Sequence, residues 1–209
     1  MCIRDRFLPV KLIIKKSFII FFLIFIIFFS SYSYSISTEK KTEDFGIITF
    51  MYHRFEENKY PSTNIKINDF KDQINLIKEN NFTFVNPNKF EQELKSKDKK
   101  KRVLLTIDDG FLSFYENAWP ILKKNQIPFI LFVSTKEIGS SNYMNWDQIK
   151  EVFSYNFTHI GNHSHSHGYL VDKDKDEIKE DLIKSIEIFK EKLNHESEFF
   201  SYPFGEYSL

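Results

Sequence analysis

Short apolar runs that alternate with segments of helical period constrain the fold of this chain more than any other feature. The runs are four to seven residues long and are bounded by turn residues, and a repeated strand-then-helix order predicts parallel strands covered by helices. Because the runs are continuously apolar, both faces of each strand are expected to be buried, as in a barrel or a doubly wound sheet. The expected strands are GIITFMY from Gly46, FTFV from Phe82, RVLLTI from Arg102, PFILFVS from Pro128, FTHIG from Phe157 and FFSYP from Phe199.

The segments between these runs carry apolar residues at helical spacing. In NDFKDQINLIKEN, Asn68 is the expected N-cap residue, and an apolar face follows it. This face consists of Phe70, Ile74 and Ile77. The longest segment covers residues 172–194, and its expected buried stripe consists of Ile178, Leu182, Ile186, Phe189 and Leu193. Trp119 and Trp146 are expected to pack in the core.

The first 37 residues have the pattern of an export signal. Lysines at positions 11, 15 and 16 precede an unbroken apolar run over residues 18–29, and small residues follow it. This run is shorter than the roughly 20 residues that a membrane-spanning helix needs. The pattern therefore favours a cleaved signal peptide, with a retained membrane anchor as the alternative. A linker over residues 38–45 and one domain over residues 46–209 would follow, located outside the cytoplasm, in the periplasm or facing the exterior.

Charge and cysteine content exclude several classes of function. Lys plus Arg and Asp plus Glu both number 29, so the chain offers no basic surface for nucleic acid. The single cysteine is Cys2, inside the expected leader, and so neither a disulfide framework nor a thiolate metal site is available. Any metal site must therefore use His and carboxylate ligands.

Polar residues follow several of the expected strands. Asp108 and Asp109 come after RVLLTI, and His53 comes after GIITFMY. In parallel α/β folds, functional groups gather at the carboxyl ends of the strands. Two adjacent carboxylates at such an end suit a site in which one binds a divalent cation and the other acts as a base. The alternative is that this pair caps a helix beginning near Ser113.

Three histidines alternate with other residues after FTHIG. His163 and His167 lie four residues apart and share a face on a helical turn or on a strand, whereas His165 joins them only on a strand. Gly161 and Gly168 flank the run and argue against a continuing strand. This pattern favours His163 and His167 as metal ligands, with His165 outside the coordination sphere. The alternative is a solvated polar loop.

Three motifs resemble those of the polysaccharide deacetylase family of carbohydrate esterases. LTIDDGF resembles the family's T-F-D-D-G motif, HSHSH matches H-S/T-x-x-H, and SYPFG resembles R-x-P-Y/F-G. The resemblance covers residues 46–209. The MYHRF segment resembles the branch that deacetylates poly-N-acetylglucosamine.

The resemblance implies a distorted (β/α) barrel of seven or eight strands and a divalent cation, commonly Zn²⁺, held by Asp109, His163 and His167. It makes Asp108 the general base that activates water against an acetamide carbonyl. The peptide N–H of Phe204 would stabilise the oxyanion, and Pro203 and His53 would lie beside the substrate. The expected substrate is an N-acetylated amino-sugar polymer of the cell envelope, poly-N-acetylglucosamine or a similar glycan, with peptidoglycan or chitin-type glycans as alternatives.

The chain departs from the family pattern in two respects. Ser201 stands where many members carry an arginine that orients the base. The family's later motifs, including a histidine that acts as general acid, would follow the third motif, and His195 does not match that position. We therefore expect a C-terminal truncation that leaves the barrel incomplete. The competing hypotheses are a periplasmic metal-binding protein and a glycan-binding relative, neither of which would be an enzyme.

Overall fold

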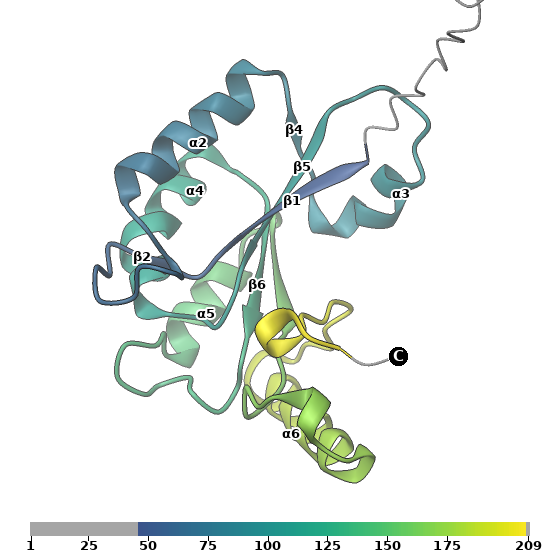
Figure 1. Ribbon diagram of the computed structural model, residues 1–209. Coiled ribbons are helices and arrows are strands. Elements are labelled where there is room, and N and C mark those ends of the chain that lie inside the picture. The colour runs from purple at the N-terminus through teal and green to yellow at the C-terminus, as the bar shows by residue number, and fades with distance from the viewer. Residues whose placement is uncertain (1–45, 208–209) are drawn as a thin grey trace, which may run out of the picture. The chain divides into compact units, whose positions relative to one another are not determined.

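A parallel sheet forms the centre of the computed structural model, which describes residues 46–207 (Figure 1). The expected leader, residues 1–37, and the expected linker, residues 38–45, both lie outside the described residues. Among the described helices, none has the length and apolar character needed to cross a membrane.

The sheet has five strands in the order β1–β5–β6–β7, and β4 pairs with the beginning of β5. All of these pairings are parallel, which confirms the predicted parallel α/β architecture. The strands do not close into a barrel within the described residues. The strand bounds are Ile47–Tyr52 (β1), Thr83–Phe84 (β4), Arg102–Ile107 (β5), Phe129–Val133 (β6) and Thr158–Asn162 (β7).

The sixth expected strand, from Phe199, forms only a single parallel bridge, between Phe200 and Asn162. The peptide N–H of Ser201 donates to the carbonyl of Asn162 at 3.0 Å. The pairing stops before Pro203, which has no N–H to donate. This short contact nevertheless brings residues 199–205 beside the end of β7.

Helices and short turns complete the fold. A second, two-stranded parallel sheet consists of β2 (Arg54–Phe55) and β3 (Asn64–Ile65). The α-helices are α2 (Ile67–Glu79), α3 (Phe90–Leu94), α4 (Trp119–Asn125), α5 (Trp146–Phe153) and α6 (Lys175–Leu193). A π-helical turn, Phe114–Ala118, precedes α4, and 3₁₀ turns cover Pro87–Lys89, Leu170–Asp172 and Pro203–Gly205.

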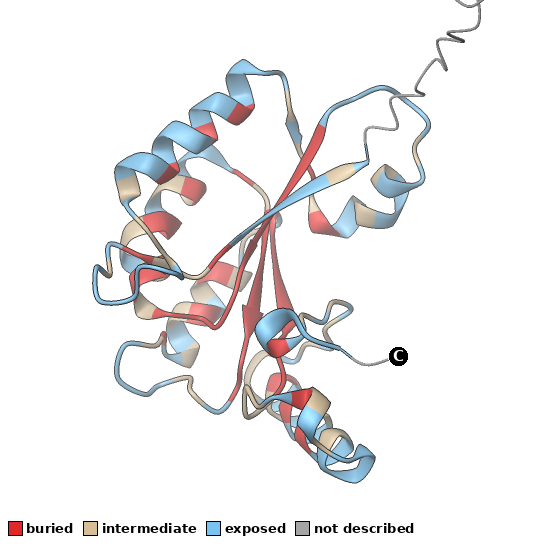
Figure 2. Cartoon of the chain, in the orientation of Figure 1, coloured by how far each residue is buried: buried red, intermediate tan, exposed pale blue. Residues whose placement is uncertain are grey.

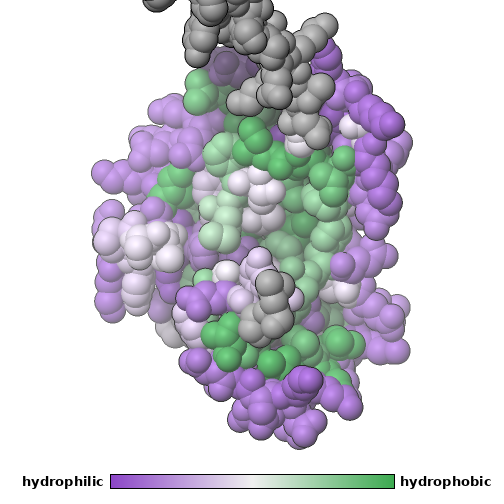
Figure 3. Space-filling view, turned by 45° about the vertical axis from the view of Figure 1, so that its right-hand side comes forward, coloured by the Kyte–Doolittle hydropathy of each residue, from purple (hydrophilic) through white to green (hydrophobic). Residues whose placement is uncertain are grey.

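Both faces of the central strands are covered, as the continuous apolar runs predict. On β5, Val103 and Leu105 belong to the large core shared with α2, α4 and α5, and Leu104 packs on the opposite face with Ile130 and Phe132. In Figure 2 the strands β5, β6 and β7 are buried along their length, whereas β1 is largely exposed. Figure 3 shows apolar side chains over the central part of one face, bordered by hydrophilic ones.

Two helix predictions need correction. Helix α2 begins at Ile67 after Lys66, so Asn68 lies within the first turn and is not the N-cap; the predicted face of Phe70, Ile74 and Ile77 is buried. Helix α6 buries Asp181, Ser185 and Phe189, while Ile186 is 49% exposed. The face that α6 turns inward is therefore partly polar, because it meets the backbone of a loop as well as apolar side chains.

Candidate metal centre and active site

Three potential metal ligands converge from the ends of β5 and β7. Asp109 follows β5, and His163 and His167 belong to the loop that leaves β7. Oδ1 of Asp109 lies 3.4 Å from Nε2 of His163 and 3.0 Å from Nε2 of His167. The three ligand atoms lie within 4.8 Å of one another. The sequence analysis predicted these residues as a ligand set, and the fold brings them to one place.

The donor set fits a divalent cation. A tetrahedral ion with ligands at about 2.0–2.1 Å places neighbouring ligand atoms roughly 3.3 Å apart, close to the separations observed here. Oδ1 of Asp108 is buried and lacks a hydrogen-bond partner among the described residues, and Oδ1 of Asp109 faces the two imidazole nitrogens. Buried carboxylate oxygens without a donor are costly unless a positive charge meets them. Nitrogen and oxygen donors of this kind suit zinc, among other ions.

The orientation of His163 is fixed on its far side. Its Nδ1 donates to the carbonyl oxygen of Ser201 at 2.8 Å. This bond fixes the tautomer and leaves the Nε2 lone pair directed at the carboxylates, as is usual for metal-binding histidines. His165 takes a different direction, with its Nδ1 hydrogen-bonded to Oγ1 of Thr135 at 2.9 Å. It lies outside the cluster of ligand atoms.

The two carboxylates differ in their surroundings. Burial raises the pKa of Asp108, and Ser201 Oγ donates to its Oδ2 at 3.1 Å. Burial alone would also raise the pKa of Asp109, but the imidazoles of His163 and His167 hold it well below its usual value. Asp109 is thus favoured as an anionic ligand, while Asp108 can take up a proton. The alternative that this pair caps the following helix does not hold: no side chain caps the π-helical turn, which Ser113 precedes.

Four residues of the site have a left-handed backbone without being glycine. They are Asp109 (φ 78°), Ser164 (φ 67°), His167 (φ 50°) and Phe204 (φ 62°). Such conformations are uncommon for residues with a side chain and persist where the surrounding structure holds them. Two of them, Asp109 and His167, belong to the ligand cluster.

A cavity of about 950 Å³ opens over the carboxylates and histidines. His53 and Phe204 line it as expected, whereas Pro203 is buried and is not part of its lining. Four half-exposed or exposed aromatic side chains from the C-terminal segment form what we call the aromatic rim. The aromatic rim consists of Phe200, Tyr202, Phe204 and Tyr207.

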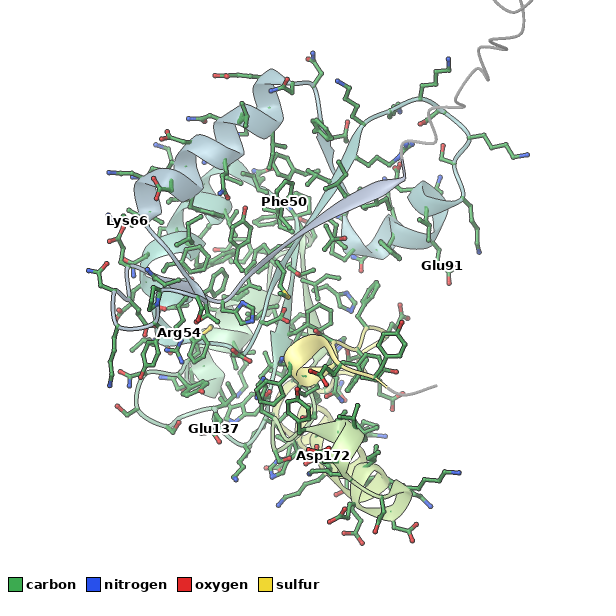
Figure 4. The ribbon with its side chains drawn as sticks, in the orientation of Figure 1. Phe50, Arg54, Lys66, Glu91, Glu137 and Asp172 are labelled. Atoms are coloured by element: carbon green, nitrogen blue, oxygen red, sulfur yellow. The ribbon has the colours of Figure 1, made fainter. Side chains whose placement is uncertain are left out.

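A further wall of the cavity was not foreseen from the sequence. The guanidinium of Arg54 lies 4.1 Å from the ring centre of Tyr60 and 3.4 Å from that of Phe111, and it pairs with Glu57 at 2.8 Å. Arg54 and Glu137, both labelled in Figure 4, line the cavity. Arg54 belongs to the MYHRF segment, but the loops that bring Tyr60, Phe111 and Glu137 to this wall are not readable from local sequence.

The sequence analysis also missed Asp181. Its carboxylate, on the buried face of α6, accepts hydrogen bonds from two peptide N–H groups of the histidine loop. One signal was present: Asp181, Ser185 and Phe189 recur every four residues, which places them on one face of a helix. Counting only apolar residues concealed this face.

Comparisons with known proteins bear on the family and the fold. A family model described as polysaccharide deacetylase matches residues 95–209. YxkH of Bacillus subtilis (strain 168) is 26% identical over 176 residues, which are 83% of this chain and 61% of that protein. The poly-beta-1,6-N-acetyl-D-glucosamine N-deacetylase of Staphylococcus aureus (strain MRSA252) is 26% identical over 170 residues, 75% of this chain and 59% of that protein. The chain thus spans less than two thirds of the length of these curated relatives.

Two solved structures share the fold. The structure of IcaB from Ammonifex degensii matches with a TM-score of 0.69 and 28% sequence identity, over 78% of this chain and 76% of that one. The deacetylase PplD of Streptococcus pyogenes, solved in complex with acetate, matches with a TM-score of 0.67 and 23% identity, over 78% and 75% of the two chains.

Proposed function

The chain belongs to the polysaccharide deacetylase family, and we propose on this basis that it removes N-acetyl groups from an amino-sugar polymer. The observation that carries the proposal is the convergence of Asp109, His163 and His167 in one cavity with a second buried carboxylate, Asp108, that is not part of the ligand set. A ligand set plus a separate base is what hydrolysis of an amide requires.

Asp109, His163 and His167 would hold a divalent cation, and we propose zinc. When bound, such an ion supplies Lewis-acid chemistry: it polarises an oxygen and makes water acidic near neutral pH. The chain's part is to hold two neutral imidazoles and one carboxylate at the separations given above. The hydrogen bond from Nδ1 of His163 to the carbonyl of Ser201 holds the ring with Nε2 toward the other ligands.

Asp108 is the proposed general base. Its Oδ1 has no hydrogen-bond partner among the described residues, and Oδ2 is held by Ser201. Burial raises the pKa of Asp108, which makes the carboxylate a better proton acceptor than an exposed aspartate. In the reaction, water adds to the acetamide carbonyl while its proton passes to Asp108. The C–N bond then breaks as the proton held by Asp108 passes to the departing nitrogen, and acetate and a free amine on the sugar are formed.

The peptide N–H of Phe204 is the proposed oxyanion donor. Phe204 has a left-handed backbone and lines the cavity, and its ring centre lies 4.8 Å from that of His167. A fixed peptide N–H close to the reacting carbon stabilises the negative oxygen that develops there.

The proposed substrate is an uncharged glycan resembling poly-N-acetylglucosamine. The aromatic rim supports this choice, because the apolar faces of sugar rings pack on aromatic side chains: Tyr202, Phe204 and Tyr207 are 49%, 58% and 65% exposed. The S. aureus relative is named for action on a polymer of this kind. We further propose, from the apolar segment over residues 18–29, that the protein acts in the cell envelope after export.

The test compares the protein with its Asp108→Asn variant. Acetate release from N-acetylglucosamine oligomers is measured with zinc or cobalt added, and cation affinity is measured in parallel. We expect release by the unsubstituted protein, and a rate lowered by roughly 10²–10⁴-fold in Asp108→Asn with nearly unchanged cation affinity. Cation binding without acetate release by the unsubstituted protein would instead support a metal-binding protein without this activity.

A further inference from the structure

The loop over residues 163–167 carries both histidine ligands, and all five of its peptide N–H groups have a partner. Those of His163, Ser164 and His167 donate to the carbonyl of Val133, to Oδ1 of Asn162 and to Oγ of Ser164, respectively. The two in the middle, of His165 and Ser166, both donate to the carboxylate of Asp181. One side chain on α6 therefore accepts the hydrogen bonds of both central peptide N–H groups of the loop.

The contact of Asp181 with the loop has the geometry of a strong interaction. His165 N–H donates to Oδ2 at 2.8 Å and Ser166 N–H donates to Oδ1 at 3.0 Å, so each oxygen takes one donor. The residue is 8% exposed, and Lys173 Nζ lies 3.8 Å from Oδ1 and offsets its charge. Hydrogen bonds to an ionised acceptor are about twice as strong as those between neutral groups.

The conformation of the loop needs such support. Ser164 and His167 both have a positive φ, 67° and 50°, which is unfavourable for residues with a Cβ atom. Two such residues within four positions require surroundings that hold them. The bonds to Asp181 lie between them, so they fix the segment that sets the separation of the two imidazoles.

The same face of α6 supports the start of the loop. Ser185, one turn after Asp181, accepts a hydrogen bond from Nδ2 of Asn162 at 2.8 Å. Oδ1 of Asn162 in turn accepts from the peptide N–H of Ser164 at 2.8 Å. The polar residues on this face of α6 thus contact the backbone of the loop, through Asp181, and the side chain of Asn162, through Ser185.

We propose that Asp181 is a positioning residue that holds the loop in its ligand conformation and thereby sets the affinity and geometry of cation binding. It touches neither the cation ligands' imidazoles nor the substrate. The inference rests on the cation site of the proposed function, but it does not depend on deacetylation. Its consequences are therefore measurable without any substrate.

The experiment compares Asp181→Asn with the unsubstituted protein and with Glu180→Gln, which removes the same charge at an exposed neighbouring position of α6. Asparagine keeps the size of the side chain but presents one acceptor and one NH₂ group to two N–H donors. Zinc affinity is measured by chelator competition, and visible absorption spectra are recorded with cobalt. Hydrogen exchange of the amides of His165 and Ser166 is measured in the metal-free proteins.

We expect Asp181→Asn to weaken zinc binding by about tenfold or more, within the 10- to 100-fold range known for outer partners of metal ligands. The cobalt spectrum should change, and exchange at residues 165 and 166 should accelerate while the amides of β5 remain protected. Glu180→Gln should match the unsubstituted protein in all three measurements. Unchanged zinc affinity and cobalt spectrum in Asp181→Asn would overturn the proposal.

Two further results would also overturn it. One is an equal acceleration of exchange in β5 and the loop, because Asp181 would then support the fold as a whole. The other is a lack of zinc binding by the unsubstituted protein. A different result separates the two proposals. If the unsubstituted protein binds zinc but releases no acetate, the proposed deacetylation is wrong. The role of Asp181 still holds in that case if Asp181→Asn weakens zinc binding.

Discussion

Ser201 joins the two halves of the site: its hydroxyl donates to Oδ2 of Asp108 at 3.1 Å, and its carbonyl accepts from Nδ1 of His163 at 2.8 Å. Substituting Ser201 by alanine removes only the first bond. This bond holds the carboxylate of the proposed base in place, and a hydrogen bond to a charged group contributes about 1.5–3 kcal/mol. We therefore expect kcat to fall by roughly tenfold or more, with little change in zinc affinity. Steady-state deacetylation and zinc competition measure the two quantities. Ser140→Ala, in an exposed turn, is the control.

If Ser201→Ala weakened zinc binding as much as it lowered kcat, the hydroxyl would not act on Asp108 alone. Because the backbone carbonyl remains in the variant, His163 should keep its orientation. A full loss of both properties would therefore contradict the division of roles assigned to Ser201.

The three histidines should differ in their effect on cation binding. His163→Ala and His167→Ala each remove a ligand, so zinc affinity should fall by more than the roughly 10- to 100-fold caused by the loss of an outer partner. His165→Ala removes only the contact with Thr135 and should change zinc affinity by less than about tenfold. Isothermal titration with zinc measures all three variants. An equal loss in all three would mean that His165 is a ligand.

Gly161 is required by packing. It lies inside β7, and a Cβ atom at this position would come within 2.3 Å of the ring of Phe132. Gly161→Ala should therefore destabilise the fold by about 1–3 kcal/mol, as overpacking of a core does. Urea unfolding of the metal-free protein measures this. Gly139→Ala is not a suitable control, because Gly139 has a φ of 90° that disfavours alanine. Ser140→Ala is again the control. A Gly161→Ala variant as stable as the unsubstituted protein would contradict the packing argument.

The aromatic rim should matter for long substrates. Tyr202 and Tyr207 line the cavity, with ring centres 5.8 Å apart. Replacing either by alanine should raise KM for N-acetylglucosamine oligomers by several-fold, since each buried aromatic contact contributes about 0.5–1.5 kcal/mol. The KM for the shortest cleaved oligomer should change less. An identical increase for all chain lengths would indicate that the rim contacts only the reacting sugar.

The fold was readable because its central strands are buried on both faces, although GIITFMY, with the same apolar pattern, forms the largely exposed strand β1. RVLLTI and PFILFVS are continuous apolar runs, and both form central parallel strands. The end of the chain was harder to interpret: FFSYP has strand composition but pairs at one position only. Whether such a run pairs along its whole length depends on tertiary contacts, which local propensity does not report.

Strand ends and histidine spacing predicted His163 and His167 as ligands beside the Asp108–Asp109 pair, and the resemblance to the deacetylase motifs assigned Asp109 as the third ligand. Asp109, His163 and His167 follow strand ends, and parallel strands bring their ends to one edge. Ser201 and Asp181 act through hydrogen bonds to other segments of the chain. Ser201 is 93 residues from its partner Asp108, and Asp181 is 16 and 15 residues from its partners His165 and Ser166. Their roles depend on three-dimensional contacts and on a helix face that is polar where apolar residues were expected. The sequence alone could not have revealed which partners they have.

Asp181 should also make stability depend on pH in a defined direction. Burial alone would raise the pKa of Asp181, but hydrogen bonds from Ser166 and from the loop's peptide groups lower it in the folded state. An aspartate in an unfolded chain has a pKa of about 3.9. Its stabilising effect is therefore fully present above that pH and is lost as the pH falls through the lower folded-state pKa.

We accordingly expect the difference in free energy of unfolding between the unsubstituted protein and Asp181→Asn to be largest near neutral pH and to shrink as the pH falls below about 4. Protonated aspartic acid and asparagine are both uncharged, so at low pH the two proteins become alike at this position. Other carboxylates cancel because they are common to both. Urea unfolding of the metal-free proteins at about pH 6 and pH 3 measures the difference. A difference that stays constant over this range would mean that Asp181 does not stabilise the loop as an anion. If the difference in free energy of unfolding between the unsubstituted protein and Glu180→Gln narrowed by the same amount, the effect would be one of net charge.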